Sequence, residues 1–178
     1  MGYQVNNKEI LNRRQWKPTI KEIGLWTVLG ILFTGQVVLC FLFYNWANLD
    51  FLLYVGWVVF AFSMVLGWLP RIAFQSKGRV PEGESWLRTT VVVDSGIYAV
   101  IRHPMYLSGI LLFISLILLS QHWLSLIFGI PIVIYFYLNM GKEERSSIEK
   151  FGDEYKDYMK RVPRMNLIMG LTRVIHQR

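Results

Sequence analysis

The chain has 178 residues, of which 53% are hydrophobic, 15% aromatic and only 17% charged. This composition is too apolar for an ordinary soluble domain and predicts an integral membrane protein. The formal net charge of +7 is explained by a basic surface that faces anionic lipid, so we expect membrane lipids and no nucleic acid among the partners.

Four apolar stretches, each near the length of about 20 residues that crosses a hydrocarbon core, contain no Asp, Glu, Lys or Arg. They are residues 23–44, 51–69, 104–120 and 123–140. Because only Gln121 and His122 separate the last two stretches, we expect these to form a tight antiparallel hairpin. With no internal repeat or flexible linker, the sequence predicts an all-α bundle of four transmembrane helices in a single domain, residues 1–178.

The basic residues predict how this bundle lies in the membrane. All nineteen Lys and Arg fall in residues 8–21, 71–102 and 142–178, and the two remaining loops contain none. By the positive-inside rule, both termini and the central connection face the cytoplasm. We therefore expect a multi-pass protein of a prokaryotic plasma membrane, or of the endoplasmic reticulum in a eukaryote.

The basic tail has the periodicity of a cytoplasmic amphipathic helix over residues 142–164. Four apolar residues repeat at spacings of three and four: Ile148, Phe151, Tyr155 and Tyr158. One turn earlier, the same stripe contains Glu144, so its carboxylate should point toward the bundle and needs a cation or a polar cavity. The alternative is that Lys142, Glu143 and Glu144 form a solvated cluster beside the membrane.

The third stretch begins in the motif IRHPMYLSGI, residues 101–110, which we call the doorway. Proline is favoured at the first helical position, so Pro104 predicts the start of a helix. The backbone N–H groups of that first turn, with Arg102 and His103 beside them, would attract a carboxylate or phosphate. The alternative makes Arg102 an interface anchor, His103 a cap and Tyr106 a residue of the aromatic belt.

Two blocks, DSGIYAVIRHPMYLSG and EERSSIEKFGDEYKDYMKRVPR, together resemble the signature of the isoprenylcysteine carboxyl methyltransferase family. These integral membrane enzymes also resemble the phospholipid N-methyltransferases. The resemblance covers residues 89–164. Membrane reductases of the sterol-reductase type, which use NADPH, share an RHP-plus-Tyr doorway. Theirs usually reads HPNY followed by Gly-Glu, whereas this chain reads HPMYLSG.

The resemblance implies an S-adenosylmethionine site at the cytoplasmic membrane boundary, and the sequence contains no Gly-rich loop of the doubly wound methyltransferases. Carried onto this chain, the cofactor-binding residues are Thr90, Val91, Val92, Val93, Tyr98, His103, Pro104, Met105, Tyr106 and Glu143. The tail helix presents a conflict, because periodicity selects Glu144 as the inward carboxylate whereas the resemblance selects Glu143. A break at Gly141 would rotate the register. We assign Glu143 to the cofactor and Glu144 as its partner.

The proposed catalytic set contains Arg102, Glu144, Arg161 and Arg164. The family usually has an arginine one turn before its glutamate, where this chain has Asn139, and Arg102 or Arg145 would supply that charge. The guanidinium groups of Arg161 and Arg164 match an acceptor carboxylate or phosphate; contact with lipid headgroups is the alternative.

The resemblance implies methyl transfer to a lipophilic acceptor, namely the carboxylate, amine or thiol of a lipid or prenylated small molecule that enters from the bilayer. Two other functions stay open at this point. One is an NADPH-dependent membrane reductase of the sterol-reductase type. The other is a noncatalytic membrane protein that binds lipid or scaffolds a partner.

Overall fold

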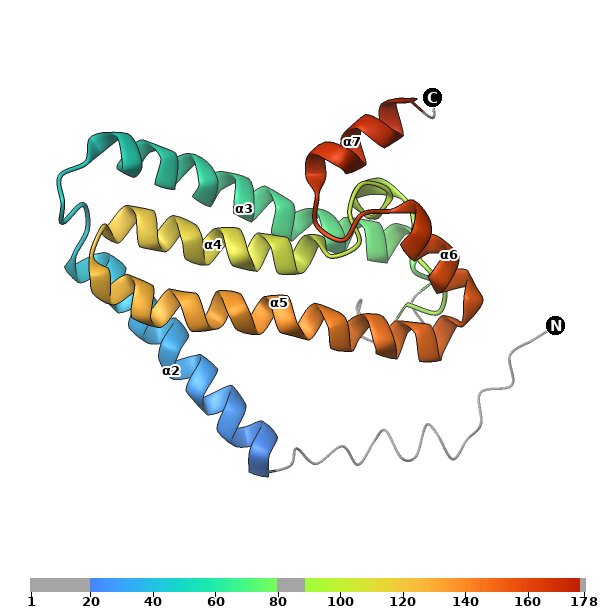
Figure 1. Cartoon of the computed structure of the whole chain (residues 1–178), viewed down its shortest axis with the longest axis horizontal. Coiled ribbons are helices and arrows are strands. Elements are labelled where there is room, and N and C mark those ends of the chain that lie inside the picture. The colour runs from blue at the N-terminus through green and yellow to red at the C-terminus, as the bar shows by residue number, and fades with distance from the viewer. Residues whose placement is uncertain (1–19, 80–88, 177–178) are drawn as a thin grey trace.

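The computed structural model describes residues 20–79 and 89–176, and helices are the regular secondary structure throughout these two ranges (Figure 1). In chain order the elements are α2 (Ile20–Leu42), α3 (Asp50–Lys77), the short 3-10 helix η1 (Gly96–Ala99), α4 (Pro104–Ser120), α5 (Trp123–Phe151), α6 (Asp153–Arg161) and α7 (Leu167–His176). The predicted all-α class is confirmed for the described residues. Most of the basic segment 8–21 and residues 80–88 of the central connection lie outside them.

Four helices form the bundle. α4 lies between α3 and α5, and α2 crosses α4 and α5 obliquely (Figure 1). Helices α2, α3 and α5 are long and apolar enough to cross a membrane, and α4 is an apolar helix of 17 residues. Many large apolar side chains of these helices are exposed, among them Trp26, Phe41, Phe51, Val58 and Ile127. Length and exposure together are those of an integral membrane protein whose outer surface contacts lipid.

The predicted bounds of the third stretch are those of α4. Pro104 occupies the first turn, where its missing N–H costs no hydrogen bond. At the other end Gln121 adopts a left-handed conformation, and its N–H donates to the Ile117 carbonyl. The N-cap of α5 follows at once, because the His122 imidazole accepts a hydrogen bond from the Leu124 N–H. Local capping therefore fixes the short connection that the sequence predicted.

Two helices extend beyond their predicted ends. α3 was expected to end at Leu69, but it continues through Pro70 to Lys77. It continues because Ala73 and Phe74 pack against the segment around Tyr98. Likewise, α5 runs through Gly141 without a break and ends before Gly152, which has a φ of +62°. The single tail helix predicted over residues 142–164 is therefore wrong: its first part is the end of α5, and its second part is α6, which ends at Arg161. A scan for charge-free residues marks the part of a helix suited to the membrane, and tertiary packing decides where the helix ends.

Small residues allow the helices of the bundle to approach closely. The Ser108 hydroxyl of α4 donates to the Ser63 carbonyl of α3 at 2.8 Å, and a Cβ added at Gly67 would lie 2.7 Å from the Ser108 Oγ. On the other side of α4, a Cβ added at Gly129 would lie 2.7 Å from the Ile117 Cδ1. A larger residue at Gly67 or Gly129 would require the facing side chain of α4 to move.

Two glutamines of the bundle differ in how their amides are satisfied. Gln36 of α2 is fully buried beside Gly129, and neither amide atom has a hydrogen-bond partner within residues 20–79 and 89–176. Gln121 accepts from the Leu49 N–H and donates to the Leu49 carbonyl, both at 3.0 Å. An unsatisfied buried amide costs about 1–3 kcal/mol, so Gln36 lowers the stability of the bundle and Gln121 raises it.

We therefore expect Gln36→Met, which keeps the side-chain length and removes the amide, to stabilise the protein by about 1 kcal/mol or more. The unfolding temperature in detergent should rise by about 2–4 °C for each kcal/mol. The matched substitution Gln121→Met should lower it, because two backbone hydrogen bonds are lost. A lower unfolding temperature for Gln36→Met would show that the Gln36 amide is satisfied in the folded protein.

Candidate functional site

The doorway and the chain after α6 pair through their backbones. The Arg102 N–H donates to the Pro163 carbonyl at 3.0 Å, and the His103 N–H donates to the Arg164 carbonyl at 3.2 Å. These two hydrogen bonds join segments that lie some sixty residues apart in the sequence. The tail thus folds back onto the end of the bundle where α4 begins (Figure 1).

A single buried carboxylate, that of Glu144, contacts the side chains of Arg102, His103 and Arg164. The Glu144 Oε1 lies 2.8 Å from the Arg102 Nη1 and 3.2 Å from the His103 Nε2. Arg164 approaches from the tail: its Nε donates to the Glu144 Oε1 at 3.1 Å, and its Nη2 donates to the Oε2. Glu144 is only 4% exposed, so these partners replace the water that an ionised carboxylate would otherwise need. We call Glu144, Arg102, His103 and Arg164 the carboxylate cluster.

Burial governs the protonation of the histidine in this cluster. Removal from water lowers the pKa of His103, against the opposing effects of Glu143 and Glu144. The imidazole is therefore neutral at pH 7, and its Nε2–H donates to Glu144. The hydrogen bond to Glu144 raises the pKa of the Arg164 guanidinium, so the two arginines supply the positive charge that balances the carboxylate.

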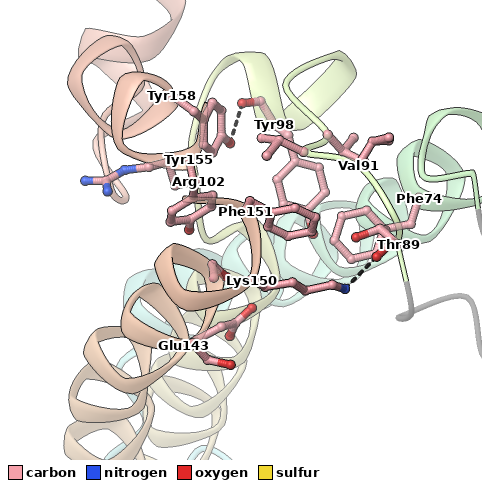
Figure 2. Close-up of a pocket in the computed structure, with 14 residues that line it drawn as sticks. Phe74, Thr89, Val91, Tyr98, Arg102, Glu143, Lys150, Phe151, Tyr155 and Tyr158 are labelled. Carbon is pink, nitrogen blue, oxygen red and sulfur yellow. Dashed lines mark hydrogen bonds between the residues drawn. The ribbon is translucent and has the colours of Figure 1, made fainter. Parts of the chain in front are cut away.

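Beside the carboxylate cluster lies a cavity of about 220 Å³ (Figure 2). Its walls come from the end of α3, the segment before the doorway, the last turns of α5 and the inner face of α6. The lining residues are Phe74, Thr89, Val91, Val92, Val93, Tyr98, Arg102, Glu143, Ser146, Ser147, Lys150, Phe151, Tyr155 and Tyr158. The lining combines aromatic and aliphatic side chains with polar ones, among them one carboxylate and two cations.

Two hydrogen bonds fasten the walls to one another. The Tyr158 hydroxyl of α6 donates to the Tyr98 carbonyl at 2.8 Å, and the Lys150 Nζ of α5 donates to the Thr89 carbonyl at 2.6 Å (Figure 2). The Tyr98 ring also stacks on Phe74 of α3, with ring centroids 4.7 Å apart. Burial raises the pKa of both Tyr98 and Tyr158, so their hydroxyls remain neutral.

Six of the predicted site residues line the cavity: Val91, Val92, Val93, Tyr98, Arg102 and Glu143. His103, Glu144 and Arg164 lie next to it in the carboxylate cluster. Other predicted residues lie outside the lining. The Thr90 hydroxyl donates to the Arg79 carbonyl at 2.9 Å, and Pro104, Met105 and Tyr106 form the first turn of α4. On the surface, the Arg161 Nη2 lies 3.5 Å from the Asp94 Oδ2.

The neighbouring carboxylates Glu143 and Glu144 occupy different environments. Glu144 is buried among cations, as the periodicity of the tail predicted. Glu143 lines the cavity, where the resemblance had placed a cofactor contact. No break at Gly141 is needed, because successive residues of one continuous helix differ by about 100° in direction. Asn139, at the position of the family's arginine, instead donates to the Tyr135 carbonyl at 2.9 Å.

Several lining residues were not predicted as site residues. Phe74 belongs to the unpredicted extension of α3, and Lys150 comes from a tail that is rich in charge throughout, so neither has a local signal. A local signal did exist for Phe151, Tyr155 and Tyr158, because they belong to the apolar stripe of the predicted tail helix. The stripe marked these residues as inward-facing, and the structure shows that what they face is the cavity.

Comparison with known proteins identifies the family. The model of the phospholipid methyltransferase family matches residues 51–154, more than half of the chain and most of the segments that build the cavity. No solved structure matches the chain significantly. The family match includes the whole of the first block that carried the resemblance in the sequence and the second block as far as residue 154.

Curated relatives include three enzymes named as methyltransferases. Methanethiol S-methyltransferase 1 of Bradyrhizobium diazoefficiens is 37% identical over 67 residues, which are 37% of this chain and 22% of the relative. Protein-S-isoprenylcysteine O-methyltransferase of Mus musculus is 36% identical over 76 residues, 42% of this chain and 27% of the relative. Methanethiol S-methyltransferase of Pseudomonas deceptionensis is 28% identical over 145 residues, which are 72% of this chain and 54% of the relative. The chain thus spans between about a fifth and a half of the lengths of these relatives. The resemblance predicted from the two sequence blocks is confirmed, and the chain belongs to the phospholipid methyltransferase family.

Proposed function

We propose that the protein transfers a methyl group from S-adenosylmethionine to a lipophilic acceptor at the cytoplasmic face of a membrane. The observation that carries this proposal is the cavity, which lies between the doorway and the tail and combines Glu143 and Arg102 with an aromatic wall. In this proposal α4 is a fourth membrane span that forms a hairpin with α5, and both termini are cytoplasmic, as the placement of Lys and Arg predicts.

The cavity residues fit the chemistry of S-adenosylmethionine. Its ammonium group suits the Glu143 carboxylate, and its carboxylate suits a guanidinium. Arg102 supplies one, because its side chain lines the cavity. The adenine ring suits the walls formed by Tyr98, Phe151 and Val91. The first turn of α4, with Met105 and Tyr106, lies outside the lining, and the Tyr106 side chain interacts with the lining residue Glu143.

When bound, S-adenosylmethionine would supply a methyl group on a cationic sulfur: a nucleophile bonds to the methyl carbon as the carbon–sulfur bond breaks, and neutral S-adenosylhomocysteine leaves. The chain contributes mainly alignment, since an ionised carboxylate or thiolate attacks without losing a proton. A neutral thiol or amine acceptor would in addition release one proton to water. Glu143 and Arg102, in the wall of the cavity, would orient the cofactor. Tyr98, Phe151 and Tyr158 would exclude water from it. Glu144, His103 and Arg164 act as positioning residues, because they hold Arg102 and the tail in place.

The acceptor is proposed to be a membrane-soluble molecule with a carboxylate, amine or thiol. The relatives are named for methanethiol and for isoprenylcysteine, and both acceptors carry apolar groups that a site at the membrane boundary can receive. Arg161 lies at the surface beside Asp94, where it remains the predicted contact for an anionic group of the acceptor. Methyl-labelled product extracted from membranes that contain the protein would identify the acceptor and the reaction together.

Isothermal calorimetry in detergent tests the cofactor. We expect the parent protein to bind S-adenosylmethionine and Glu143→Gln to bind it at least tenfold more weakly, about 1.4 kcal/mol, because one charge-assisted contact is lost. Glu149→Gln is the matched control, since Glu149 is exposed on the same helix and does not line the cavity. Absence of heat with the parent protein would reject the proposal, and binding of NADPH in its place would favour the reductase.

A separate prediction concerns the contribution of the carboxylate cluster to the stability of the protein. Glu144→Gln should destabilise the protein by about 3 kcal/mol, because it leaves the Arg102 side chain, which is 11% exposed, without its counter-charge. The Arg164 side chain is 37% exposed and adds less, because water can replace part of its contact. Glu143→Gln should change the unfolding temperature less, because its neighbour is the Tyr106 hydroxyl and no cation within residues 20–79 and 89–176 forms an ion pair with it. In the double variant Glu144→Gln with Arg164→Met, the loss should be smaller than the sum of the two single losses by about 1 kcal/mol or more. Additive losses would show that Glu144 and Arg164 act independently.

A further inference from the structure

The C-terminal helix α7 has a defined start and is docked in a fixed orientation. Asn166 caps it: the side-chain Oδ1 accepts from the Met169 N–H and the carbonyl accepts from the Gly170 N–H, both at 3.0 Å. Arg173 donates to the carbonyls of Ala99 and Arg161. These contacts tie α7 both to the segment before the doorway and to the end of α6.

The contact between α7 and the doorway segment depends on a glycine. Gly170 is buried, and a Cβ added there would lie 2.0 Å from the Val100 carbonyl oxygen. The backbone of α7 therefore rests directly on residues 99–100, which precede the apolar helix α4 by four residues. This close approach fixes which face of α7 meets the protein and which face points away.

The face that points away is apolar. Ile168, Leu171 and Ile175 follow one another at spacings of three and four, so they lie on one side of the helix. Ile168 is 79% exposed and Ile175 is 69% exposed. The exposed residues Thr172 and His176 form a polar edge next to this stripe. A stripe of this kind on a docked helix is a surface that water does not favour.

The position of α7 indicates what covers the stripe. The helix lies at the end of the bundle where α4 begins, on the side of α3 in Figure 1. At that end of α3, the Arg71 guanidinium lies 5.4 Å from the centre of the Trp68 ring, a pair typical of the boundary between headgroups and acyl chains. Exposed apolar residues of α3, including Leu69 and Ile72, continue the lipid-facing surface to this level.

Charge at this end favours the same occupant. Exposed basic residues lie on or just after the C-terminal parts of α3 and α5, at the end of the bundle where α4 begins (Figure 1): Arg71, Lys77, Arg79, Lys142 and Arg145. Exposed carboxylates of α5 and α6, such as Glu149 and Asp153, lie at the same end. Basic side chains next to an apolar helical face match the chemistry of a leaflet that contains anionic lipid.

We propose that α7 is an in-plane membrane anchor, with Ile168, Leu171 and Ile175 inserted at the boundary between the headgroups and acyl chains of a bilayer leaflet. The helix thereby holds residues 99–103, and with them one wall of the cavity, at a set depth relative to the lipid. This inference rests on the geometry of α7 and does not require methyl transfer.

Site-directed fluorescence quenching of the full chain tests the anchor. In a Cys40→Ser background, single cysteines replace Ile168, Leu171 or Ile175 on the apolar stripe, and Thr172→Cys is the matched control on the polar edge. Each variant is labelled with bimane and reconstituted in vesicles of phosphatidylcholine and phosphatidylglycerol. None of these four residues makes the docking contacts of Gly170 and Arg173, and three apolar positions keep the result independent of any one variant.

Lipids with brominated acyl chains should quench each label on the stripe at least about threefold more strongly than the label at residue 172. Aqueous iodide should show the reverse order. Equal access of iodide to all four labels would overturn the proposal, because the stripe would then face water. Protection of the stripe from both quenchers would also overturn it, since another protein chain, such as a second copy, would then cover the face.

Discussion

The buried carboxylate of Glu144 is the constraint on which the cavity depends. An ionised group that is 4% exposed needs cations and donors in place of water, and α5 alone supplies none on that face. Arg102 and His103 come from the doorway and Arg164 comes from the tail. Satisfying one side chain therefore brings three distant segments together. Tyr155 and Tyr158 of α6 belong to the same tail segment as Arg164. The Tyr158 hydroxyl donates to the Tyr98 carbonyl and so closes the cavity on that side.

The division of roles between two adjacent glutamates follows from helix geometry. Side chains at successive positions point about 100° apart, so a helix at the edge of a cavity can bury one carboxylate and present the next. Glu144 is neutralised by its neighbours and serves the architecture, while Glu143 lines the cavity. A strongly paired carboxylate would be a poor ligand for a second cation, which is why Glu143 is the better candidate for an ammonium group.

Local signals in the sequence predicted the parts of this arrangement that local physics determines. Pro104 and the absence of charge gave both bounds of α4, and the apolar stripe of the tail gave the inward direction of Glu144. The extension of α3 to Lys77 was not predictable, because it depends on Phe74 stacking on a residue that lies beyond the helix. Similarly, Arg164 carries no local mark that separates a ligand for an acceptor from a partner of Glu144. Pairings between distant segments decided these outcomes, and no window of sequence contains both partners.

In the proposed topology the cavity lies at the boundary between membrane and water, which bears on why such chemistry would be placed at the end of a membrane bundle. Close contacts such as that between Ser108 and Ser63 pack the helices tightly. A ligand could therefore pass between them only by breaking helix–helix contacts. At the end of the bundle, a polar nucleotide can approach from water and an apolar acceptor can approach from lipid. Neither molecule then has to cross the solvent that it avoids. The polar groups that this requires are concentrated at the boundary, where Glu144 and its partners satisfy one another. The fold thus confines the cost of buried charge to the one place where it holds the proposed reaction site together.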